Sequence, residues 1–393
     1  MDRLKKAVKA VLKFLYKALT LLLPVRKKLI VFESGAGRSY AGNPRAIYEE
    51  MVRRNLDSRY VCVWSLENPR IPIPGRARKV KRLRWRYLYY MAKAEYWVFD
   101  GRHPAWLKKR KETIYLQTWH GTPLKKLALD LTTLNMGGDR DLAAYKAAFV
   151  ENVRQWDILL SQNRYASDIF RRAFNFTGEM WEIGYPRNDA LVKRDFAGLR
   201  EKLGLPDGKK LILYAPTWRD DRFYSYGRYK FEFFFDVDRV KDALGSQAVL
   251  LCKPHYLAAV EPRPADPRIR MFPPEQDIQE LLLVADVLVT DYSSVMFDFS
   301  ILKRPMIFWM HDEDHYRDEL RGFYFDLAEC APGPVVRDTD SLIHELLRVL
   351  RDEAEYWRKY GPAYDAFRGK FNHAENGGAA GKVVDWIERG RME

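Results

Sequence analysis

Short apolar runs recur along the whole chain, and a segment with helical character follows nearly every one. Strands that alternate with helices are typical of βαβ units, in which neighbouring strands run parallel. The pattern pauses at 199–209, a charged stretch that contains Gly204, Pro206 and Gly208, and then restarts. The runs predicted to be strands are Leu29–Glu33, Tyr60–Trp64, Tyr96–Phe99, Thr113–Gln117, Ile158–Leu160, Lys210–Ala215, Gln247–Lys253, Ile269–Phe272, Val287–Thr290 and Pro305–Trp309. We therefore predict an α/β fold with two doubly wound, Rossmann-like domains whose strand ends face an interdomain cleft.

The length of the chain, 393 residues, suffices for two domains of ordinary size, and its 47% apolar content fits two folded cores. We predict an opening helix at 1–25, an N-terminal Rossmann-like domain at 26–205 and a C-terminal Rossmann-like domain at 206–393. The sequence leaves open whether the last helix, about 379–391, packs back on the N-terminal domain. The three cysteines lie far apart, which favours a reducing compartment over a disulfide framework.

The opening segment has the pattern of an amphipathic helix. Apolar side chains recur at steps of three and four, and lysines at positions 5, 9, 13 and 17 lie on another side. The apolar stripe consists of Leu4, Val8, Val11, Leu12, Leu15, Leu19 and Leu22. The longest uncharged run, 18–25, is too short to span a bilayer, which takes about 20 residues. The pattern predicts a helix lying on a membrane surface; the alternative is an ordinary helix packed on the domain.

The formal net charge of +14 also indicates an anionic partner. A basic cluster between Arg76 and Arg86 is followed by three tyrosines, a composition that suits either nucleic acid or an anionic membrane. The opening helix favours the membrane. We therefore expect a peripheral protein at the cytoplasmic face of the cell membrane, with an anionic membrane surface as partner and no nucleic acid.

A lone histidine follows one of the predicted strands. His120 lies in Gln117–Pro123, where glycine and proline end the regular structure. A neutral imidazole at a strand end can accept a proton from an attacking hydroxyl at physiological pH. The alternative is a histidine that only hydrogen-bonds the turn. Because the strand ends face the expected cleft, we interpret His120 as the catalytic base.

Two segments of the second half have the character of an anion site. Lys253 and His255 flank a proline directly after a strand, and both could donate to a phosphate whose charge grows during transfer. Ser293 and Ser294 follow the buried strand at 287–290, where hydroxyls and free N–H groups can bind an anion. Plain helix capping explains the serines about as well. It does not explain Asp298, which is predicted to lie among apolar neighbours and could bind ribose hydroxyls.

Thr217 and Arg219 end the first strand of the second half, so we expect them at the mouth of the same cleft. A guanidinium there suits a diphosphate, although a surface arginine is an equal alternative. The acidic and histidine-containing segment 311–315 is better explained as a solvated loop than as a metal site. The Gly35–Gly37 segment is too short for a dinucleotide fingerprint. We expect neither a metal nor another cofactor.

Taken together, these segments resemble the CDP-glycerol glycerophosphotransferase family of teichoic acid synthesis. The resemblance runs in order from about residue 29 to 376. It is carried by Asn43–Arg45, Thr118–Pro123, Ile183–Arg187, Tyr214–Arg219, Lys253–His255, Thr290–Ser294 and Arg321–Asp326. Any one of these segments would be a weak signal, whereas seven in the same order are specific.

The resemblance implies a GT-B fold, a CDP-activated polyol phosphate donor and a polyprenyl-diphosphate-linked acceptor at the membrane. The family's Trp-His-Gly-Thr histidine falls on His120, its Lys-Pro-His histidine on His255, and its hydroxyl pair on Ser293 and Ser294. The catalytic residues are therefore expected to be His120 and His255. The expected substrate-binding residues are Ser293, Ser294, Asp298, Thr217, Arg219, Lys253, Asn43 and Arg45.

Polymerases of this family typically carry a further N-terminal region, whereas here the first strand begins near residue 29. This difference favours a primase of the TagB/TarB type. The expected reaction is transfer of glycerol phosphate from CDP-glycerol to a hydroxyl of an undecaprenyl-diphosphate-linked disaccharide, with release of CMP. The alternatives are a GT-B glycosyltransferase that uses a nucleotide sugar, a polyol-phosphate polymerase and a non-catalytic membrane scaffold. Ribitol as the donor polyol and the oligomeric state stay open.

Overall fold

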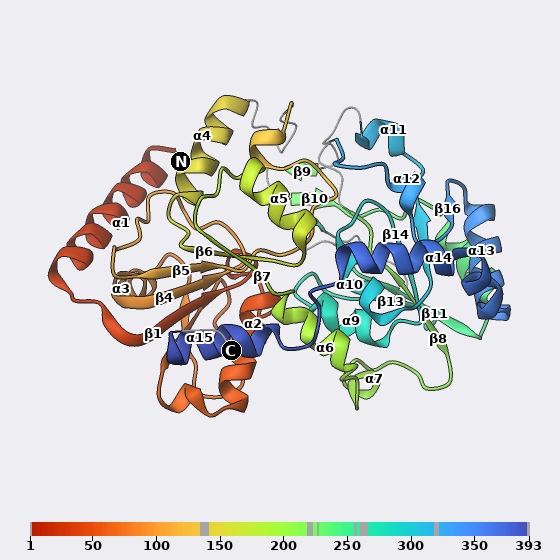
Figure 1. The fold of residues 1–393 in the computed structure, drawn as a ribbon, viewed down its shortest axis with the longest axis horizontal. Helices are drawn as coiled ribbons and strands as arrows, with labels where there is room; N and C mark the ends of the chain where they lie inside the picture. Colours follow the sequence, from red (N-terminus) through yellow and green to blue (C-terminus); the bar gives the residue numbers. More distant parts are fainter. Residues whose placement is uncertain are drawn as a thin grey trace.

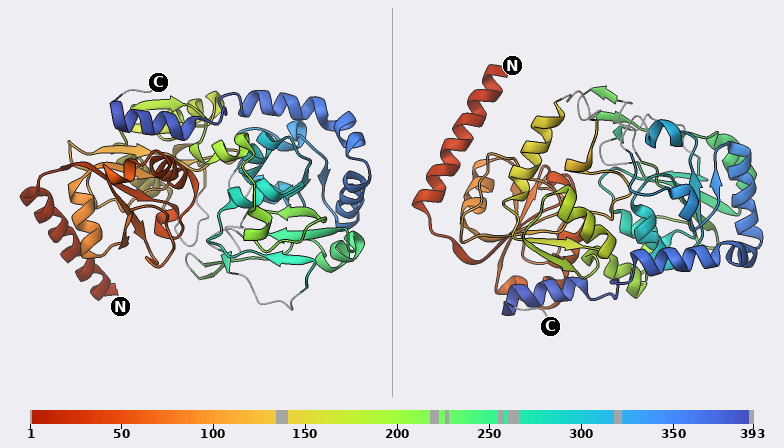
Figure 2. Two further views of the ribbon diagram at one scale, coloured as in Figure 1. Left: turned by 90° about the horizontal axis from the view of Figure 1, so that it is seen from below. Right: turned by 45° about the horizontal axis from the view of Figure 1, so that its top comes forward.

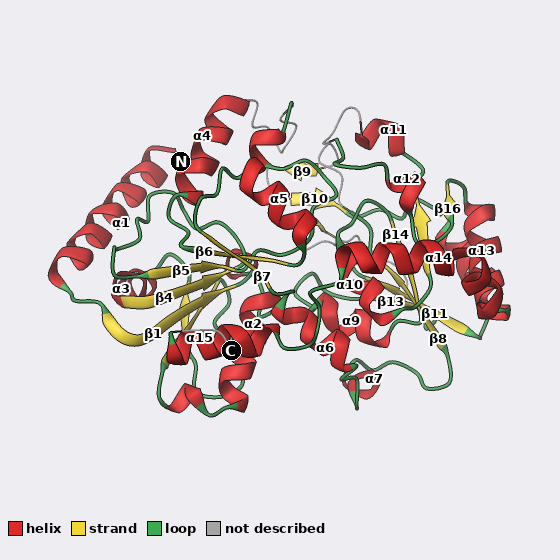
Figure 3. Cartoon of the chain, in the orientation of Figure 1, coloured by secondary structure: helices red, strands yellow, loops and turns green. Residues whose placement is uncertain are grey.

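The protein is represented by a computed structural model that describes residues 2–133, 141–217, 223–225, 228–254, 258–259, 266–317 and 322–390. It contains two large parallel sheets, and Figure 3 shows helices around each of them. The α/β class expected from the sequence is confirmed. All the predicted strands are present, with only their end residues shifted.

The first sheet has seven strands in the order β3-β2-β1-β4-β5-β6-β7, and every neighbouring pair is parallel. Its strands are β1 (Arg26–Glu33), β2 (Val61–Leu66), β3 (Arg78–Lys81), β4 (Ala94–Phe99), β5 (Ile114–Gln117), β6 (Ile158–Ser161) and β7 (Glu179–Glu182). The central strands are almost entirely buried because helices cover both faces, which is why they read as continuous apolar runs.

Strand β3 was not predicted, and it lies inside the basic cluster 76–86. Three of its four residues are exposed and only Val80 is buried, as is common for a charged edge strand. The next cation, Arg82, is not free for a partner, because it forms an ion pair with the buried Glu33 at 3.0 Å. Part of the basic cluster is therefore structural.

The second sheet has six parallel strands in the order β13-β11-β8-β14-β15-β16. Its strands are β8 (Lys210–Tyr214), β11 (Ala248–Cys252), β13 (Ile269–Met271), β14 (Val287–Thr290), β15 (Met306–Trp309) and β16 (Val335–Val336). A small sheet lies beside it, made of β9 (Phe223–Ser225), β10 (Arg228–Lys230) and β12 (Ala258–Ala259). The strand order reverses between β1 and β4 in the first sheet and between β8 and β14 in the second. Doubly wound sheets bind ligands at the strand ends beside such a reversal.

The helices of the first half are α1 (Asp2–Leu22), α2 (Gly42–Arg53), α3 (Trp85–Lys93), α4 (Leu142–Val153), α5 (Arg164–Ala173), α6 (Asp189–Lys193) and α7 (Leu199–Lys202). Those of the second half are α8 (Val237–Leu244), α9 (Ile278–Val284), α10 (Val295–Phe299), α11 (Glu313–His315), α12 (Leu327–Cys330), α13 (Thr339–Arg351), α14 (Glu353–Phe371) and α15 (Ala379–Arg389). Figure 1 shows how they distribute over the two domains.

The chain crosses between the domains twice. Helices α6 and α7, which the predicted boundary at 205 assigned to the first domain, pack on the second core through Leu191, Leu199 and Leu203. The chain returns after α14, because α15 packs on the first domain through Val383 and Ile387. Figure 2 shows α14 and α15 running along one side of the molecule from one domain to the other. These two crossings hold the domains together across the cleft.

Helix α1 lies along the outer edge of the first domain and packs against α3 (Figure 1). Tyr16 is buried and its hydroxyl donates to the carbonyl of Lys108 at 2.8 Å, while Leu12 and Leu19 contact the same core. Other apolar side chains of the helix are exposed, among them Phe14 and Leu21, at 73% and 76%. Within the described residues, no helix is both long and apolar enough to cross a membrane.

Candidate active site in the interdomain cleft

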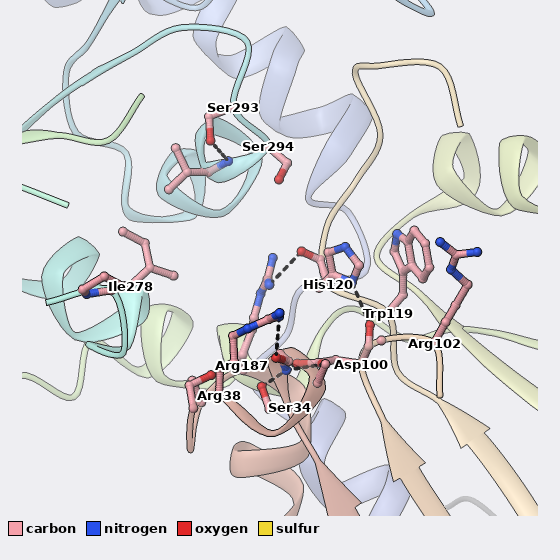
Figure 4. A pocket seen from close by; sticks show the side chains of 18 of the residues that line it. Ser34, Arg38, Asp100, Arg102, Trp119, His120, Arg187, Ile278, Ser293 and Ser294 are labelled. Atoms are coloured by element: carbon pink, nitrogen blue, oxygen red, sulfur yellow. Dashed lines mark hydrogen bonds between the residues drawn. The ribbon is translucent and has the colours of Figure 1, made fainter. Parts of the chain in front are cut away.

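A cavity of about 840 Å³ lies between the two domains, at the carboxyl ends of both sheets. Loops that follow β1, β4 and β5 line it from the first domain, and loops that follow β8, β11 and β14 line it from the second. Figure 4 shows this pocket, with His120 on one wall and Ser293 and Ser294 on the other. The cleft expected from the sequence is therefore present, and it brings the two most informative motifs face to face.

The His120 loop is held from behind by an asparagine. Asn43 is completely buried, and its amide nitrogen donates to the carbonyl oxygens of Thr118 and Trp119 at 3.0 and 2.9 Å. Its amide oxygen accepts from the backbone N–H of Arg187 at 3.1 Å. All of these bonds are internal, and Asn43 does not line the cavity. Asn43 fixes the shape of the loop, and its expected role in substrate binding stays a prediction.

The His120 ring is oriented by a hydrogen bond to the backbone. Its Nδ1 lies 2.7 Å from the carbonyl oxygen of Asp100. A carbonyl only accepts, so Nδ1 carries the proton and the lone pair is on Nε2. In Figure 4, the ring nitrogen that is not bonded to Asp100 faces the cleft. This is the tautomer that a general base requires.

The surroundings of His120 keep it neutral. Desolvation between the two domains lowers its pKa to about 4, and the positive charges of Arg187 and Arg102 act in the same direction. The ring itself stays open to the cleft and stacks on Trp119, with ring centroids 4.4 Å apart. At neutral pH the imidazole can therefore accept a proton without first losing one.

The opposite wall carries the predicted hydroxyl pair. Ser293 and Ser294 follow β14 and line the cavity. Among the described residues, the Ser293 hydroxyl makes only a long contact, 3.5 Å, with the N–H of Val295, and Ser294 does not cap α10 with its side chain. A Cβ at Gly121 would lie 2.8 Å from the Ser294 hydroxyl oxygen, so glycine is required next to His120 for this close approach. The hydroxyls are thus presented to the cleft instead of being used in the helix.

Lys253 is the cation of this wall. It is buried, lines the cavity, and donates to the carbonyl oxygens of Pro254 and Pro274 at 3.0 and 2.9 Å. Burial lowers its pKa to about 8, while Asp277 and Glu275 act in the opposite direction. Most molecules therefore carry a positive charge at Lys253 at pH 7. The two further residues expected here, Arg219 and His255, lie outside the described residues.

Asp298 lies in a polar environment, not in the apolar one that the sequence suggested. Its carboxylate accepts from Arg187 Nη2 at 2.6 Å and from Asn188 Nδ2 at 3.0 Å. The side-chain amides of Gln162 and Gln279 donate to it at 3.3 Å each. These four donors occupy the acceptor sites of the carboxylate. Asp298 nevertheless lines the cavity, and the ribose-binding role predicted for it stays a prediction.

Arg187 was not predicted as a site residue, although its segment belongs to the resemblance. One terminal nitrogen of its guanidinium donates to the carbonyl of His120 at 2.9 Å, and the other donates to Asp298. It thus connects the His120 loop to the second domain. The signal available in the sequence was an arginine directly after Gly-Tyr-Pro, but its partner lies 111 residues away.

Glu375 lies behind this pair. Asn188 Nδ2 donates to it at 2.7 Å, as does the backbone N–H of Tyr185 at 3.2 Å. Burial raises the pKa of Glu375 to about 8, and the neighbouring charge of Asp298 adds to the shift. Glu375 is therefore largely protonated at neutral pH and adds little negative charge beside the Arg187–Asp298 ion pair.

Two other predicted residues also act within the protein. Arg45 forms ion pairs with Asp277 at 3.1 Å and Glu280 at 3.0 Å, so it joins α2 to the second domain and does not line the cavity. Thr217 is buried and its N–H donates to Asp291 at 2.7 Å, whereas the preceding residues, Ala215 and Pro216, reach the cavity. The substrate-binding roles predicted for Arg45 and Thr217 are not supported by this geometry. Among the described residues, no three His, Cys, Asp or Glu side chains are grouped to hold a metal ion.

Comparisons with known proteins point to one family. The sequence model described as "CDP-Glycerol:Poly(glycerophosphate) glycerophosphotransferase" matches residues 15–389. The teichoic acid poly(glycerol phosphate) polymerase of Bacillus subtilis (strain 168) is 42% identical over 95% of this chain and 50% of its own length. The polymerase of the same name from Bacillus spizizenii is 40% identical over 93% of both chains. The teichoic acid glycerol-phosphate transferase of Staphylococcus aureus is 38% identical over 92% of this chain and 93% of its own length. The chain thus spans about half of the first relative and nearly all of the other two.

Solved structures give the same result. The wall teichoic acid polymerase TagF superposes with a TM-score of 0.87 at 38% identity, covering 99% of this chain and 96% of that chain. A histidine-to-asparagine variant of that polymerase, soaked with CDPG, has a TM-score of 0.88. A UDP complex of Staphylococcus aureus MnaA is 11% identical with a TM-score of 0.51, so it shares the fold alone. The expected two-domain GT-B type architecture is confirmed.

Proposed function

Because the chain belongs to the CDP-glycerol glycerophosphotransferase family, we propose that it transfers glycerol phosphate from CDP-glycerol to a hydroxyl of a lipid-linked acceptor. The observation that carries this proposal is the position of His120. Its Nδ1 is bonded to the carbonyl of Asp100, and its free nitrogen lies in a cleft whose other wall presents Ser293 and Ser294. A base and an anion site on opposite walls fit transfer of a phosphoryl group between two bound substrates.

The acceptor hydroxyl attacks the phosphorus atom that carries glycerol. A new P–O bond forms while the bond from that phosphorus to the bridging oxygen of the diphosphate breaks. CMP leaves with the electron pair on its phosphate, and the proton of the hydroxyl passes to His120 Nε2. Since the pKa of His120 is lowered to about 4, the ring is unprotonated and ready to accept this proton at neutral pH.

The donor diphosphate is proposed to lie against the second domain. The hydroxyls of Ser293 and Ser294 and the ammonium of Lys253 supply donors and positive charge on that wall, where charge develops on the phosphate oxygens. His255 and Arg219 remain proposed partners of the diphosphate. Support for this donor comes from the polymerase structure soaked with CDPG, which we take to be CDP-glycerol.

Glycerol is the polyol that the relatives favour. Those that handle glycerol phosphate are 38% to 42% identical, whereas the ribitol-phosphate primase of Bacillus spizizenii is 27% identical. The comparisons separate a polymerase from a primase less clearly than they separate glycerol from ribitol. The Bacillus spizizenii polymerase matches this chain over 93% of its own length, so a polymerase of this family need not carry a long additional region. The absence of such a region in this sequence therefore does not favour a primase. The higher identities support a polymerase, and the Staphylococcus aureus glycerol-phosphate transferase keeps addition of one or a few units as the alternative.

The acceptor is proposed to reach the cleft from a membrane surface to which α1 binds. The helix uses only part of its apolar stripe for packing, through Leu12, Tyr16 and Leu19. Several other apolar side chains of the helix are exposed: Val11, Phe14, Leu15, Leu21 and Leu22. An exposed apolar face beside a row of lysines is the pattern of a helix in the headgroup region. This feature favours an enzyme with a lipid-borne acceptor over one with two soluble substrates.

The deciding experiment is incubation of the protein with CDP-glycerol and an undecaprenyl-diphosphate-linked disaccharide, followed by mass measurement of the products. Growth by many glycerol phosphate units supports the polymerase, and growth by one or a few supports the primase. Parallel reactions with CDP-ribitol and with UDP-sugars test the donor. Transfer from a UDP-sugar but not from CDP-glycerol would establish the glycosyltransferase alternative. Absence of nucleotide binding would favour a scaffold.

A further inference from the structure

The cleft extends beyond His120 into an arm that the donor does not need. It is bordered by the loop after β4, the segment 127–131 and helix α4. It is lined by Ala105, Trp119, Leu127, Leu131, Tyr145 and Phe149. Most of these side chains are apolar or aromatic, in contrast to the serines and lysine of the donor wall. A ligand in this arm would lie on the opposite side of His120 from the diphosphate.

One cation stands over this apolar lining. The guanidinium carbon of Arg102 lies 4.5 Å from the ring centre of Phe149 and 5.4 Å from that of Tyr145. In Figure 4, Arg102 lies beside Trp119, on the side of that ring away from His120. Stacking on aromatic rings fixes the plane of a guanidinium and leaves its N–H groups free to donate in that plane.

Arg102 lacks a carboxylate partner among the described residues. This is unusual for a cleft arginine here, since Arg82 pairs with Glu33 and Arg187 pairs with Asp298. Lys126 also lines the cavity, and within the described part of the chain no acidic side chain pairs with it either. A cation in the arm with no acidic partner among the described residues fits a site whose anion is supplied by the ligand.

Helix α1 contacts the loop that borders the arm. Tyr16 of α1 packs on Trp106, with ring centroids 6.3 Å apart, so α1 docks on the same loop that supplies Ala105 to the arm. Figure 1 shows α1 along the outer edge of the same domain, where it packs against α3. The loop after β4 therefore contacts both the arm and the helix with the exposed apolar face.

We propose that this arm is the acceptor subsite and that Arg102 binds a phosphate group of the acceptor. The inference rests on the proposed function, because it assumes that His120 receives the proton of an acceptor hydroxyl. Two acceptors carry such a group: a chain that ends in glycerol phosphate, with a phosphodiester next to the reacting hydroxyl, and a disaccharide diphosphate, with the phosphates at its far end. A planar guanidinium can donate two parallel hydrogen bonds to either.

The test compares three soluble acceptors in steady-state kinetics with CDP-glycerol. They are a short glycerol phosphate oligomer, a disaccharide with a short-chain diphosphate, and the same disaccharide without phosphate. In Arg102→Ala we expect the KM of the phosphate-bearing acceptor to rise on the order of tenfold to a hundredfold. Arg102→Lys should recover part of the loss. The KM of the neutral disaccharide and the CDP-glycerol Kd from calorimetry should stay as in the wild type.

Arg154→Ala is the matched control. Arg154 directly follows α4, the helix that supplies the aromatic rings under Arg102, but it lies outside the cleft and pairs with Glu151. Arg102 is exposed, so its replacement should not unfold the domain, and a thermal melt checks this. An equal rise in KM for the neutral disaccharide would assign Arg102 to packing, and a weaker CDP-glycerol Kd would assign it to the donor. Unchanged kinetics in Arg102→Ala would overturn the subsite, whereas a wild-type protein without transfer to any acceptor would overturn the proposed function instead.

Whether Arg102 acts on one acceptor or on both separates the two sources of phosphate. A loss confined to the glycerol phosphate oligomer places the phosphodiester of a growing chain in the arm, as a polymerase requires. A loss confined to the disaccharide diphosphate places the lipid diphosphate there, as a primase requires.

Discussion

The two walls of the cleft are prepared in different ways. On the N-terminal wall the protein itself orients the reactive group, since Asp100 fixes the His120 ring and Asn43 holds its loop. On the C-terminal wall, the hydroxyls of Ser293 and Ser294 make little use of hydrogen bonds within the described residues. A base must be aligned before the reaction, whereas phosphate-binding hydroxyls can take their partners from the donor. The difference suggests that the first wall determines rate and the second determines donor affinity.

Desolvation acts on both walls but has opposite consequences. It lowers the pKa of His120 to about 4 and that of Lys253 to about 8. At pH 7 the first group is therefore neutral and can accept a proton, while the second is still positive and can attract a phosphate. The same physical cause thus yields a base on one side and a cation on the other.

The largest expected effect comes from removing the base. His120→Ala should lower kcat by roughly 10²–10⁴-fold, the usual contribution of a general base. The CDP-glycerol Kd should stay near the wild-type value, because the diphosphate is proposed to lie on the opposite wall. Single-turnover kinetics and calorimetry measure the two quantities, and His344→Ala on the exposed face of α13 is the control. A Kd that weakens as much as kcat falls would show that the walls do not divide the work.

The next effect should come from the contact that joins the walls. Arg187 and Asp298 are buried, and removal of one partner of such a pair typically costs about 3–5 kcal/mol of folding stability. Arg187→Lys keeps the charge but cannot reach both the His120 carbonyl and Asp298 as the guanidinium does. We therefore expect Arg187→Lys to lower kcat by up to about 10²-fold through misplacement of His120, with little change in donor Kd.

The measurement for Arg187 is kcat well below the melting temperature, with the melt recorded for each variant. Arg53→Ala is a suitable control, because Arg53 pairs with Glu50 at the surface and such pairs contribute about 0–1 kcal/mol. If Arg187→Lys loses stability but keeps wild-type kcat, the contact only holds the domains together and does not align the base.

The contrast between His120 and Arg187 shows what the sequence could and could not reveal. The strands were predictable because buried parallel strands are continuous apolar runs, and His120 was predictable because it directly follows one of them. Arg187 and Asp298 meet only after both domains have folded, and no local pattern encodes a contact between residues 111 positions apart. For the same reason Asp298 was placed among its apolar sequence neighbours, whereas three of its four hydrogen-bond partners come from the first half of the chain: Gln162, Arg187 and Asn188. Strand β3 was missed because an edge strand of basic residues lacks the apolar signal.

A third prediction tests the donor wall. Ser294→Ala should weaken the CDP-glycerol Kd by about tenfold or more, since a hydrogen bond to a charged group contributes about 1.5–3 kcal/mol. Turnover should fall as well, because the same hydroxyl is proposed to bind the more highly charged transition state. Calorimetry with CDP-glycerol gives the Kd. Wild-type affinity in this variant would remove Ser294 from the donor site and would leave helix termination as its role.

The pH dependence of kcat/KM should report on one group from each wall, His120 and Lys253. In kcat/KM the rate should fall below about pH 4 as His120 becomes protonated, and should fall again above about pH 8 as Lys253 loses its proton. The alkaline decrease should be only several-fold, because Ser293 and Ser294 remain in place. Lys253→Met should have a weaker donor Kd and no alkaline decrease near pH 8. If that decrease persists in the variant, a different group causes it.

The smallest effect on the chemistry should come from the outer face of α1. Deletion of residues 1–24 would remove Tyr16 from the first core, so loss of folding could mimic loss of membrane binding. Phe14→Glu together with Leu21→Glu avoids this, because both side chains are more than two-thirds exposed. The double variant should float poorly with anionic vesicles, yet turn over a short-chain soluble acceptor at the wild-type rate, since neither wall of the cleft is altered.

Raised salt should weaken vesicle binding of the wild type, because its lysines face the lipid charge. Phe196→Glu, which replaces a half-exposed aromatic residue elsewhere on the surface, is the matched control and should float normally. If the double variant floats as well as this control, α1 is a packing element and the membrane binds another surface.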